Sequence, residues 1–208
     1  MTDVAHRAIF FDRDGTLNEE VGYINHVSRL RLLPAAAAAV RAVNAAGWRA
    51  IVVTNQAGAA RGYFPGWMIE AVHARLREEL AAAGAQLDAI YVCPHHPTVG
   101  EPPYRLECEC RKPKPGLLLQ AARDFGLDLT QCVVVGDRYS DVQLAHRVGA
   151  RGVLVLTGYG RGEYEYQREQ WSGWPDYVAE DVLDAVTWVL KTQGITLPTT
   201  PLQLRSGS

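Results

Sequence analysis

The stretch at residues 8–16, Ala-Ile-Phe-Phe-Asp-Arg-Asp-Gly-Thr, contains the pattern that decides the fold of this chain. Four consecutive apolar residues end abruptly in two aspartates, Asp12 and Asp14. A short apolar run that stops at polar residues and glycine is typical of a strand buried on both faces. Similar runs lie at 50–53, 89–92, 132–135 and 153–156. The chain therefore carries five predicted buried strands.

Helical patterns separate these strands. Residues 35–46 are rich in alanine, begin after Pro34 and end at Gly47, where a left-handed cap fits. A short helix is expected over 139–148. Apolar stripes with helical spacing are formed by Met68, Val72, Leu76 and Leu80, by Leu118, Leu119, Ala122 and Phe125, and by Val182, Val186, Val189 and Leu190. Apolar strands that alternate with helices predict a doubly wound α/β fold with a parallel sheet.

The composition sets limits on the class of protein. The chain has 208 residues, which suits a single domain over 1–194 followed by a flexible tail at 195–208. A net charge of −2 argues against a nucleic-acid partner. No apolar run is long enough for a membrane span, and the N-terminus does not have the pattern of a signal peptide. We therefore expect a cytoplasmic, monomeric protein.

Two stretches interrupt the alternation of strands and helices. Residues 94–115 contain six of the eleven prolines and are expected to form a long irregular insertion. Residues 158–175, rich in Gly, Tyr and Trp, are expected to form a second loop. Loops of this length in a small domain are usually functional, or are held by something other than a core.

Polar residues follow three of the predicted strands. Asp12 and Asp14 follow the first, Thr54 the second and Asp137 the fourth. Ligands of open α/β sheets bind at the carboxyl ends of the strands, so these groups should meet at one edge. Such a concentration of like charge indicates a divalent cation. Each signal alone has a structural alternative: an Asp-x-Asp turn, or helix N-caps at Thr54-Asn55 and at Asp137.

The residue types suggest the chemistry of this edge. A carboxylate such as Asp12 is able to attack phosphorus, and a second one, Asp14, is able to protonate a leaving group and then activate water. The hydroxyl and backbone N–H of Thr54 would bind phosphoryl oxygens. Lys112, with Arg111 beside it in the proline-rich insertion, would offset the charge on the phosphoryl group.

The cysteines form a second group of candidate ligands. A Cys₃His set suits tetrahedral Zn²⁺, and an irregular loop without a core needs such a cross-link. The predicted ligands are Cys93, His95, Cys108 and Cys110, with His96 as the alternative to His95. Four protein ligands would make this zinc structural and would fix the adjacent Arg111 and Lys112. Cys132 lies in a predicted strand and is interpreted as a core residue.

Four segments carry a resemblance to a known family: FFDRDGT, VVTNQ, CRKPKPG and VVVGDRYSD. They resemble the ordered motifs of the haloacid dehalogenase-like phosphatase superfamily, over residues 8 to 157. The finer pattern DRDGTLN, followed by GYI and TNQAGAARG, is similar to D-glycero-D-manno-heptose 1,7-bisphosphate 7-phosphatases and their relatives, the histidinol-phosphate phosphatases. Ala57 and Arg138 depart from the usual Ser and Lys of that family.

The resemblance implies a Mg²⁺-dependent phosphomonoesterase with an aspartyl-phosphate intermediate. Asp12, the backbone carbonyl of Asp14 and Asp137 would hold Mg²⁺. With no cap domain, substrate contacts would come from loops around the cleft, at Glu20, Val21, Gly22, Tyr23, Asn55, Gln56, Arg61, Arg111 and Arg138. The favoured substrate is the heptose bisphosphate, which would lose its 7-phosphate. Alternatives are histidinol phosphate, another small metabolite or, less favoured, a nucleic-acid end.

Overall fold

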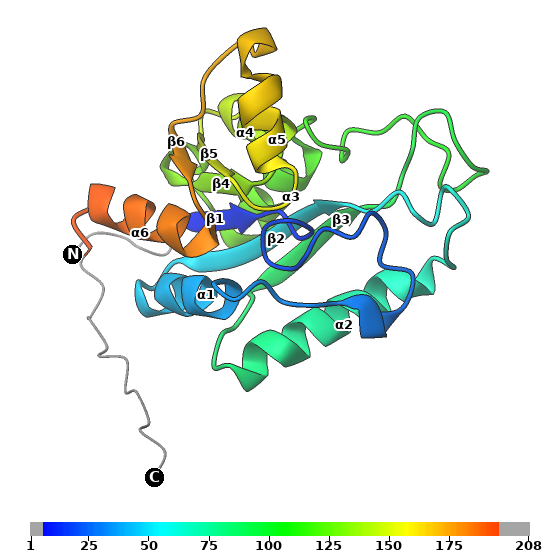
Figure 1. Cartoon of the computed structure of the whole chain (residues 1–208), viewed down its shortest axis with the longest axis horizontal. Helices are drawn as coiled ribbons and strands as arrows, with labels where there is room; N and C mark the ends of the chain where they lie inside the picture. Colours follow the sequence, from blue (N-terminus) through cyan, green and yellow to red (C-terminus); the bar gives the residue numbers. More distant parts are fainter. Residues whose placement is uncertain (1–5, 196–208) are drawn as a thin grey trace.

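The computed structural model describes residues 6–195, which form a six-stranded, fully parallel sheet with helices on both faces (Figure 1). The strands are β1 (Ala8–Phe11), β2 (Arg49–Asn55), β3 (Ala89–Cys93), β4 (Val133–Gly136), β5 (Arg151–Val155) and β6 (Tyr177–Ala179). Their order is β3-β2-β1-β4-β5-β6, so the chain reverses direction across the sheet at β1. This confirms the predicted doubly wound α/β fold.

Two apolar layers cover the sheet because the side chains of each strand alternate between its faces. The helices, labelled in Figure 1, are α1 (Ala36–Ala45), α2 (Trp67–Ala82), α3 (Gly116–Phe125), α4 (Tyr139–His146), α5 (Gly160–Tyr166) and α6 (Val182–Thr192). Ile9 and Phe11 of β1 pack with α1, α2 and α6, while Ala8 and Phe10 pack with α3 and α4. All four side chains are fully buried.

The register of the sheet brings the ends of three strands together. Phe11, the last residue of β1, pairs with Val52 of β2 and Val135 of β4. The backbone N–H of Asp12 continues this ladder by donating to the carbonyl of Val135, at 2.9 Å. Asp12 therefore lies between the carboxyl ends of β2 and β4, at the point where the strand order reverses and where ligands of such folds bind.

Three details of the predicted fold are wrong. The expected loop at 158–175 contains α5 and a 3-10 helix, η4 (Arg168–Gln170), and β6 follows it; β6 has only three residues, too few for a visible pattern. Leu119 of the predicted stripe is 42% exposed; because α3 begins at Gly116, it buries Leu117, Leu118 and Ala121 instead. Cys132 is buried in the layer under α3 and α4 as expected, but precedes β4.

The connections on the carboxyl side of the sheet have little regular structure. Residues 94–115, green in Figure 1, contain no helix or strand and only one isolated bridge, between His96 and Arg105, as predicted for this insertion. The connection from β1 to α1 holds one 3-10 helix, η2 (Val27–Arg29). Of the predicted tail, all but Ile195 lies outside the described residues. None of the helices in residues 6–195 has the length and apolar character to cross a membrane.

Candidate active site

A cleft of about 350 Å³ opens at the carboxyl ends of β1, β2 and β4. Its walls come from five segments: the residues after β1, the end of β2 with the residues after it, the proline-rich insertion, the residues that lead from β4 into α4, and the turn after β5. The lining residues are Asp12, Asp14, Glu20, Gly22, Tyr23, Thr54, Asn55, Gln56, Ala57, Arg111, Lys112, Arg138, Ser140 and Tyr159. The cleft thus brings together predicted site residues that lie a hundred positions apart in the chain.

A buried lysine and three carboxylates lie at the centre of the site. The ammonium group of Lys112 lies 2.7 Å from Oδ1 of Asp12 and 2.7 Å from Oδ1 of Asp141. Carboxylate oxygens of Asp12, Asp137 and Asp141 all lie within 4.8 Å of one another, and all three residues are buried. One lysine therefore faces three carboxylates, which leaves a local excess of negative charge.

Backbone and amide contacts fix the position of Lys112. Its Nζ donates to the carbonyl of Val53, at 3.1 Å. The Asn55 side chain accepts from the backbone N–H of Lys112 at 3.1 Å and donates to its carbonyl at 3.3 Å. Asn55 lines the cleft as predicted, but both ends of its amide are engaged by Lys112. The structure thus ties the insertion directly to the end of β2.

The electrostatics of the carboxylates indicate that a cation belongs among them. Burial raises the pKa of Asp12 to about 6, although Lys112 acts in the opposite direction. Burial and repulsion from Asp12 and Asp141 raise the pKa of Asp137 to about 8. In addition, Oδ1 of Asp137 is buried without a hydrogen-bond partner. A hard divalent cation would neutralise these groups and use the free oxygen, so the donor set fits Mg²⁺.

Two glycines make room for Asp137. A Cβ atom on Gly15 or on Gly158 would come within 2.1 Å of Oδ2 of Asp137. Both glycines also have positive φ angles, of 80° and 53°. The same Oδ2 accepts a hydrogen bond from the backbone N–H of Tyr159, at 2.8 Å. The turns after β1 and β5 therefore close around this carboxylate, leaving its other oxygen for a ligand.

Asp14 lies apart from the three clustered carboxylates. Its carboxylate accepts hydrogen bonds from Arg13, from Asn18 at 2.8 Å and from Gln56 at 2.7 Å. Burial opposes its charge, but Arg13 and these hydrogen bonds prevail and lower the pKa of Asp14. Gln56 also donates to Oγ1 of Thr54, at 2.9 Å. Metal binding by the backbone carbonyl of Asp14 stays a prediction.

The cysteine cluster forms as predicted, with His95 as its histidine. Ligand atoms of Cys93, His95, Cys108 and Cys110 lie within 4.8 Å of one another. The Sγ of Cys110 is 2.9 Å from that of Cys93 and 3.3 Å from Nδ1 of His95. Three sulfurs and one imidazole nitrogen are a donor set that fits tetrahedral Zn²⁺.

His96, the alternative ligand, is used elsewhere. Its Nδ1 accepts from the backbone N–H groups of Thr98 and Val99, at 3.2 and 3.1 Å, and its Nε2 lies 3.0 Å from Arg61. Arg61, predicted to bind substrate, therefore contacts the insertion and does not line the cleft. Val21 is also absent from the lining and is 36% exposed.

Two predicted cations do line the cleft. Arg111 donates to the carbonyl of His95, at 3.1 Å, so a predicted zinc ligand positions it. The guanidinium of Arg138 lies 3.8 Å from the ring centroid of Tyr159 and 3.6 Å from Glu163 of α5.

The alternative interpretation of Thr54-Asn55 and Asp137 as helix N-caps is wrong. Thr54 and Asn55 are the last two residues of β2. The N-cap of α4 is Arg138, whose backbone N–H donates to the side chain of Asp141.

Sequence reasoning placed Asp141 at this edge of the sheet but gave it no role, and it did not predict Ser140 or Tyr159 as site residues. Asp141 closes the motif VVVGDRYSD and lies one helical turn after Asp137, and this spacing was the available signal. Gly136 makes room for it, since a Cβ there would lie 2.3 Å from the Asp141 carboxylate. Tyr159 carries no such signal, because its place depends on the turn after β5.

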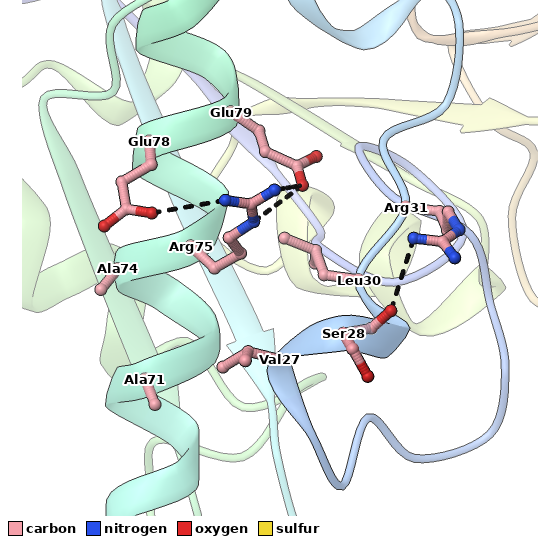
Figure 2. A pocket seen from close by; sticks show the side chains of 9 residues that line it. All are labelled: Val27, Ser28, Leu30, Arg31, Ala71, Ala74, Arg75, Glu78 and Glu79. Carbon is pink, nitrogen blue, oxygen red and sulfur yellow. Dashed lines mark hydrogen bonds and ion pairs between the residues drawn. The ribbon is translucent and has the colours of Figure 1, made fainter.

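A second cavity, of about 410 Å³, lies between η2 and α2 and is shown in Figure 2. Its charged groups are occupied: Arg75 lies 2.9 Å from Glu79 and 3.7 Å from Glu78. Arg31 donates to the backbone carbonyl of Ser28 at 3.4 Å. The other walls are aliphatic apart from Ser28, whose hydroxyl lies 2.8 Å from Nδ1 of His26. None of the metal-ligand groups found among residues 6–195 lies in this cavity, so we assign it no chemistry.

Comparison with known proteins gives a consistent result. Residues 109–185 match the model of the HAD-hydrolase-like family. The D-glycero-D-manno-heptose-1,7-bisphosphate 7-phosphatase of Thermosynechococcus vestitus is 45% identical over 190 residues, covering 88% of this chain and 94% of the relative. The chain belongs to the D-glycero-D-manno-heptose-1,7-bisphosphate 7-phosphatase family. This confirms the resemblance found in the motifs.

Other members of the heptose bisphosphate phosphatase family support the assignment. The D-glycero-beta-D-manno-heptose-1,7-bisphosphate 7-phosphatase of Haemophilus influenzae is 38% identical over 185 residues, covering 86% of this chain and 94% of the relative. The crystal structure of D,D-heptose 1,7-bisphosphate phosphatase from B. bronchiseptica, complexed with magnesium and phosphate, superposes with a TM-score of 0.78 at 33% identity. It covers 89% of this chain and 99% of that one.

Proposed function

We propose that the protein is a phosphomonoesterase that removes the 7-phosphate of D-glycero-D-manno-heptose 1,7-bisphosphate. The observation that carries the proposal is the buried set of Asp12, Asp137 and Asp141 around Lys112, of which Asp12 and Lys112 line a polar cleft. Membership in the heptose bisphosphate phosphatase family supplies the substrate class, a small phosphorylated sugar. All these residues come from one chain, so a single domain over 1–194, acting as a monomer, suffices.

In the proposed reaction, an Asp12 carboxylate oxygen attacks phosphorus, and the leaving sugar oxygen takes a proton from the protonated form of Asp14, a minor form whose lowered pKa makes it a strong proton donor. A water molecule then gives a proton back to Asp14 as it attacks the phosphorus of the aspartyl-phosphate, which releases inorganic phosphate and restores Asp12. Lys112 holds Asp12 in place and offsets the charge of the phosphoryl group, and Thr54 binds its oxygens. Asp12 contacts Lys112 directly, which supports these roles.

Two metals are part of the proposal. Asp12 and Asp137 would hold Mg²⁺, with Asp141 beside them; when bound, Mg²⁺ would neutralise these carboxylates and withdraw charge from the phosphoryl oxygens. Cys93, His95, Cys108 and Cys110 would hold a structural Zn²⁺ that fixes Arg111 next to the cleft. The four cysteines are free thiols, which suits the reducing cytoplasm as the proposed compartment.

The polar and cationic groups in the walls of the cleft suit a doubly phosphorylated, polyhydroxylated substrate. Glu20, Gln56 and the backbone around Gly22 offer hydrogen-bonding groups, and Arg111 and Arg138 offer two cations beyond Lys112. With the 7-phosphate on Asp12, the distal phosphate would reach Arg111. An apolar ligand would find few apolar side chains here. Histidinol phosphate, with one phosphate, would leave the second cation unused.

A phosphate-release assay with Mg²⁺ over sugar bisphosphates and histidinol phosphate tests the proposal. We expect the highest kcat/KM for the heptose 1,7-bisphosphate, with loss of the 7-phosphate only. Arg111→Ala should reduce the preference in kcat/KM for the heptose 1,7-bisphosphate over histidinol phosphate. The expected reduction is about 1.5–3 kcal/mol, the contribution of a charge-assisted hydrogen bond. A higher kcat/KM for histidinol phosphate would overturn the substrate but leave the phosphatase assignment in place.

The role of Asp14 has a separate test. Asp14→Asn keeps the size of the side chain but is unable to take a proton from water. We expect slow turnover and accumulation of the phosphorylated enzyme, detected by intact-protein mass spectrometry after mixing with substrate. If this variant turns over at the normal rate, the acid–base role belongs to another residue.

A further inference from the structure

Arg13 stands between two aspartates that face the cleft, but its own side chain points into the protein. It is 1% exposed and is the largest fully buried side chain of the described residues. It does not line the cleft. On the side of α2 its charge acts on His73, and burial together with this charge lowers the pKa of His73 to about 3. Among residues 6–195, the ion pair of Arg13 is with Asp14.

The guanidinium instead donates hydrogen bonds to both oxygens of the Asp14 carboxylate. Its Nη2 lies 3.0 Å from Oδ1 and 2.8 Å from Oδ2, and its Nε lies 3.2 Å from Oδ1. Asn18 donates to Oδ1 and Gln56 to Oδ2. Each carboxylate oxygen thus accepts at least two hydrogen bonds, which fixes the plane and the direction of the group. The planar guanidinium, with its N–H donors in a rigid fork, fixes the direction of a carboxylate more strongly than the point charge of an ammonium group does.

Folding does not require an ion pair at this position. A buried ion pair usually adds little stability relative to apolar residues of the same volume, because both charges lose their hydration. Phe11, which lies on the same side of the chain as Arg13 by the alternation of the strand, and Leu17 are fully buried in the apolar layer that includes α2. What an apolar residue would not supply is a fixed direction for Asp14.

We propose that Arg13 is a positioning residue that sets the direction in which the Asp14 carboxylate exchanges protons in the cleft. The inference rests on the proposed function, because direction matters only if Asp14 transfers protons. Arg13 reaches neither the cleft nor the carboxylates of Asp12, Asp137 and Asp141. Its removal should therefore slow the chemical steps and leave substrate and metal binding nearly unchanged.

The first test is the substitution Arg13→Met, which keeps the length of the side chain and removes the fork. With the preferred substrate and Mg²⁺, we expect kcat to fall at least about tenfold while KM stays within about twofold, since misplacing a proton-transfer group affects the chemistry and not the binding. Arg13→Lys keeps the charge and loses the fork, so its kcat should lie between those of wild type and Arg13→Met.

The second test asks whether Arg13 acts through Asp14. Arg13→Met should reduce kcat strongly in the wild type but by less than about twofold in the Asp14→Asn background, because the group that it positions is then already lost. Arg77→Met is the control: Arg77 also lies near His73, but it donates to the carbonyl of Leu87 and does not contact Asp14. Its kcat should equal that of wild type.

The outcomes separate this inference from the proposed function. Normal kcat in folded Arg13→Met would show that Asp14 is merely the counterion of Arg13, and equal losses in both backgrounds would show that Arg13 acts elsewhere; either overturns the inference. If Arg13→Met does not fold, Arg13→Lys decides, and wild-type kcat in that variant overturns the inference as well. A wild-type protein that releases no phosphate from any sugar phosphate would overturn the proposed function and, with it, the role of Arg13.

Discussion

The carboxylate cluster and the cysteine cluster are both predicted metal sites, but the fold holds them in opposite ways. Asp12 and Asp137 follow β1 and β4, whose backbones belong to the central sheet, so the core places them whether or not a metal is bound. Three of the four ligands in the other cluster, His95, Cys108 and Cys110, lie in an insertion without a helix or strand. There the metal would have to place the chain.

The comparison shows that the two sites relate differently to folding. The carboxylates are close together because apolar burial elsewhere holds them there, and their repulsion makes the site unfavourable until a cation neutralises it. The insertion has little core of its own, so metal binding and local folding there should be one event. Removing Mg²⁺ should therefore stop the chemistry and spare the fold, and removing Zn²⁺ should affect both.

The largest effect is expected from Asp12→Asn. The amide is a poor nucleophile and a poor metal ligand, so turnover should fall at least about a thousandfold. Because β1 is placed by the sheet, the far-UV circular dichroism spectrum and the zinc content should match wild type. Phosphate release and metal analysis on one preparation check both. Loss of the fold in this variant would break the proposed contrast between the two sites.

The next effect is that of Cys110→Ser on the insertion. We expect less than half an equivalent of zinc, a loss of about 3–5 kcal/mol in the free energy of unfolding and a fall in kcat/KM of about a hundredfold as Lys112 is displaced. Urea denaturation, metal analysis and kinetics measure these. Cys132→Ala is the matched control, since Cys132 is buried outside the cluster; its zinc content should be normal. Full activity without zinc would contradict the structural role.

A smaller effect concerns the pH dependence of stability without Mg²⁺. The folded-state pKa of Asp137 is about 8, above its usual value of 3.8. Between these values the folded protein binds more protons than the unfolded chain, so stability should fall as the pH rises, by about 1 kcal/mol per pH unit. Between pH 6 and pH 8, Tm of metal-free protein should drop by about 5 °C. Mg²⁺ should restore most of this lost Tm at pH 8.

Asp137→Asn is the control for this pH effect. The amide does not titrate, so Tm of the metal-free variant should vary less between pH 6 and pH 8, and Mg²⁺ should raise it less. If Tm of wild type and variant shows the same pH dependence, the ionisation of Asp137 does not destabilise the metal-free protein. The zinc site should behave differently, because Mg²⁺ has little affinity for thiolates and should not restore protein from which zinc has been removed.

The smallest effect is expected from Arg61→Ala. Arg61 is exposed, and its contact is with His96 of the insertion, not with the cleft. Loss of an exposed contact costs about 1 kcal/mol or less, so KM should change less than about twofold and Tm only slightly. Arg111→Ala, by contrast, should change substrate preference. A large rise in KM for Arg61→Ala would restore its predicted role in substrate binding.

The parts of the molecule that could be predicted are those with local signals. The apolar runs of β1 to β5 are visible because β1, β2, β4 and β5 are largely buried on both faces and β3 is half-buried. Among the predicted helices, α1, α2, α3 and α6 have Pro or Gly near an end. β6 and α5 were missed because they have three and seven residues, and short elements depend on the packing around them. Leu119 was misassigned because apolar residues adjacent in sequence leave the phase of a helix open.

The sequence by itself determined which chemical groups the protein has and the edge of the sheet at which they appear. Asp12, Asp14, Thr54 and Asp137 each follow an apolar run, and the carboxyl ends of parallel strands meet at one edge. The Cys₃His set was likewise visible from composition and spacing. These inferences hold because periodicity and strand direction are local properties, recorded in consecutive residues.

Only the tertiary structure decided how these groups pair. It placed Asp141 beside Lys112, gave His95 and not His96 to the cysteine cluster, and joined Asn55 to the backbone of Lys112, 57 positions away in the chain. It also turned Arg13 inward onto Asp14. Such pairings depend on the path of loops that cross the ends of the strands. That path is set by the packing of the whole chain, which no short stretch of sequence records.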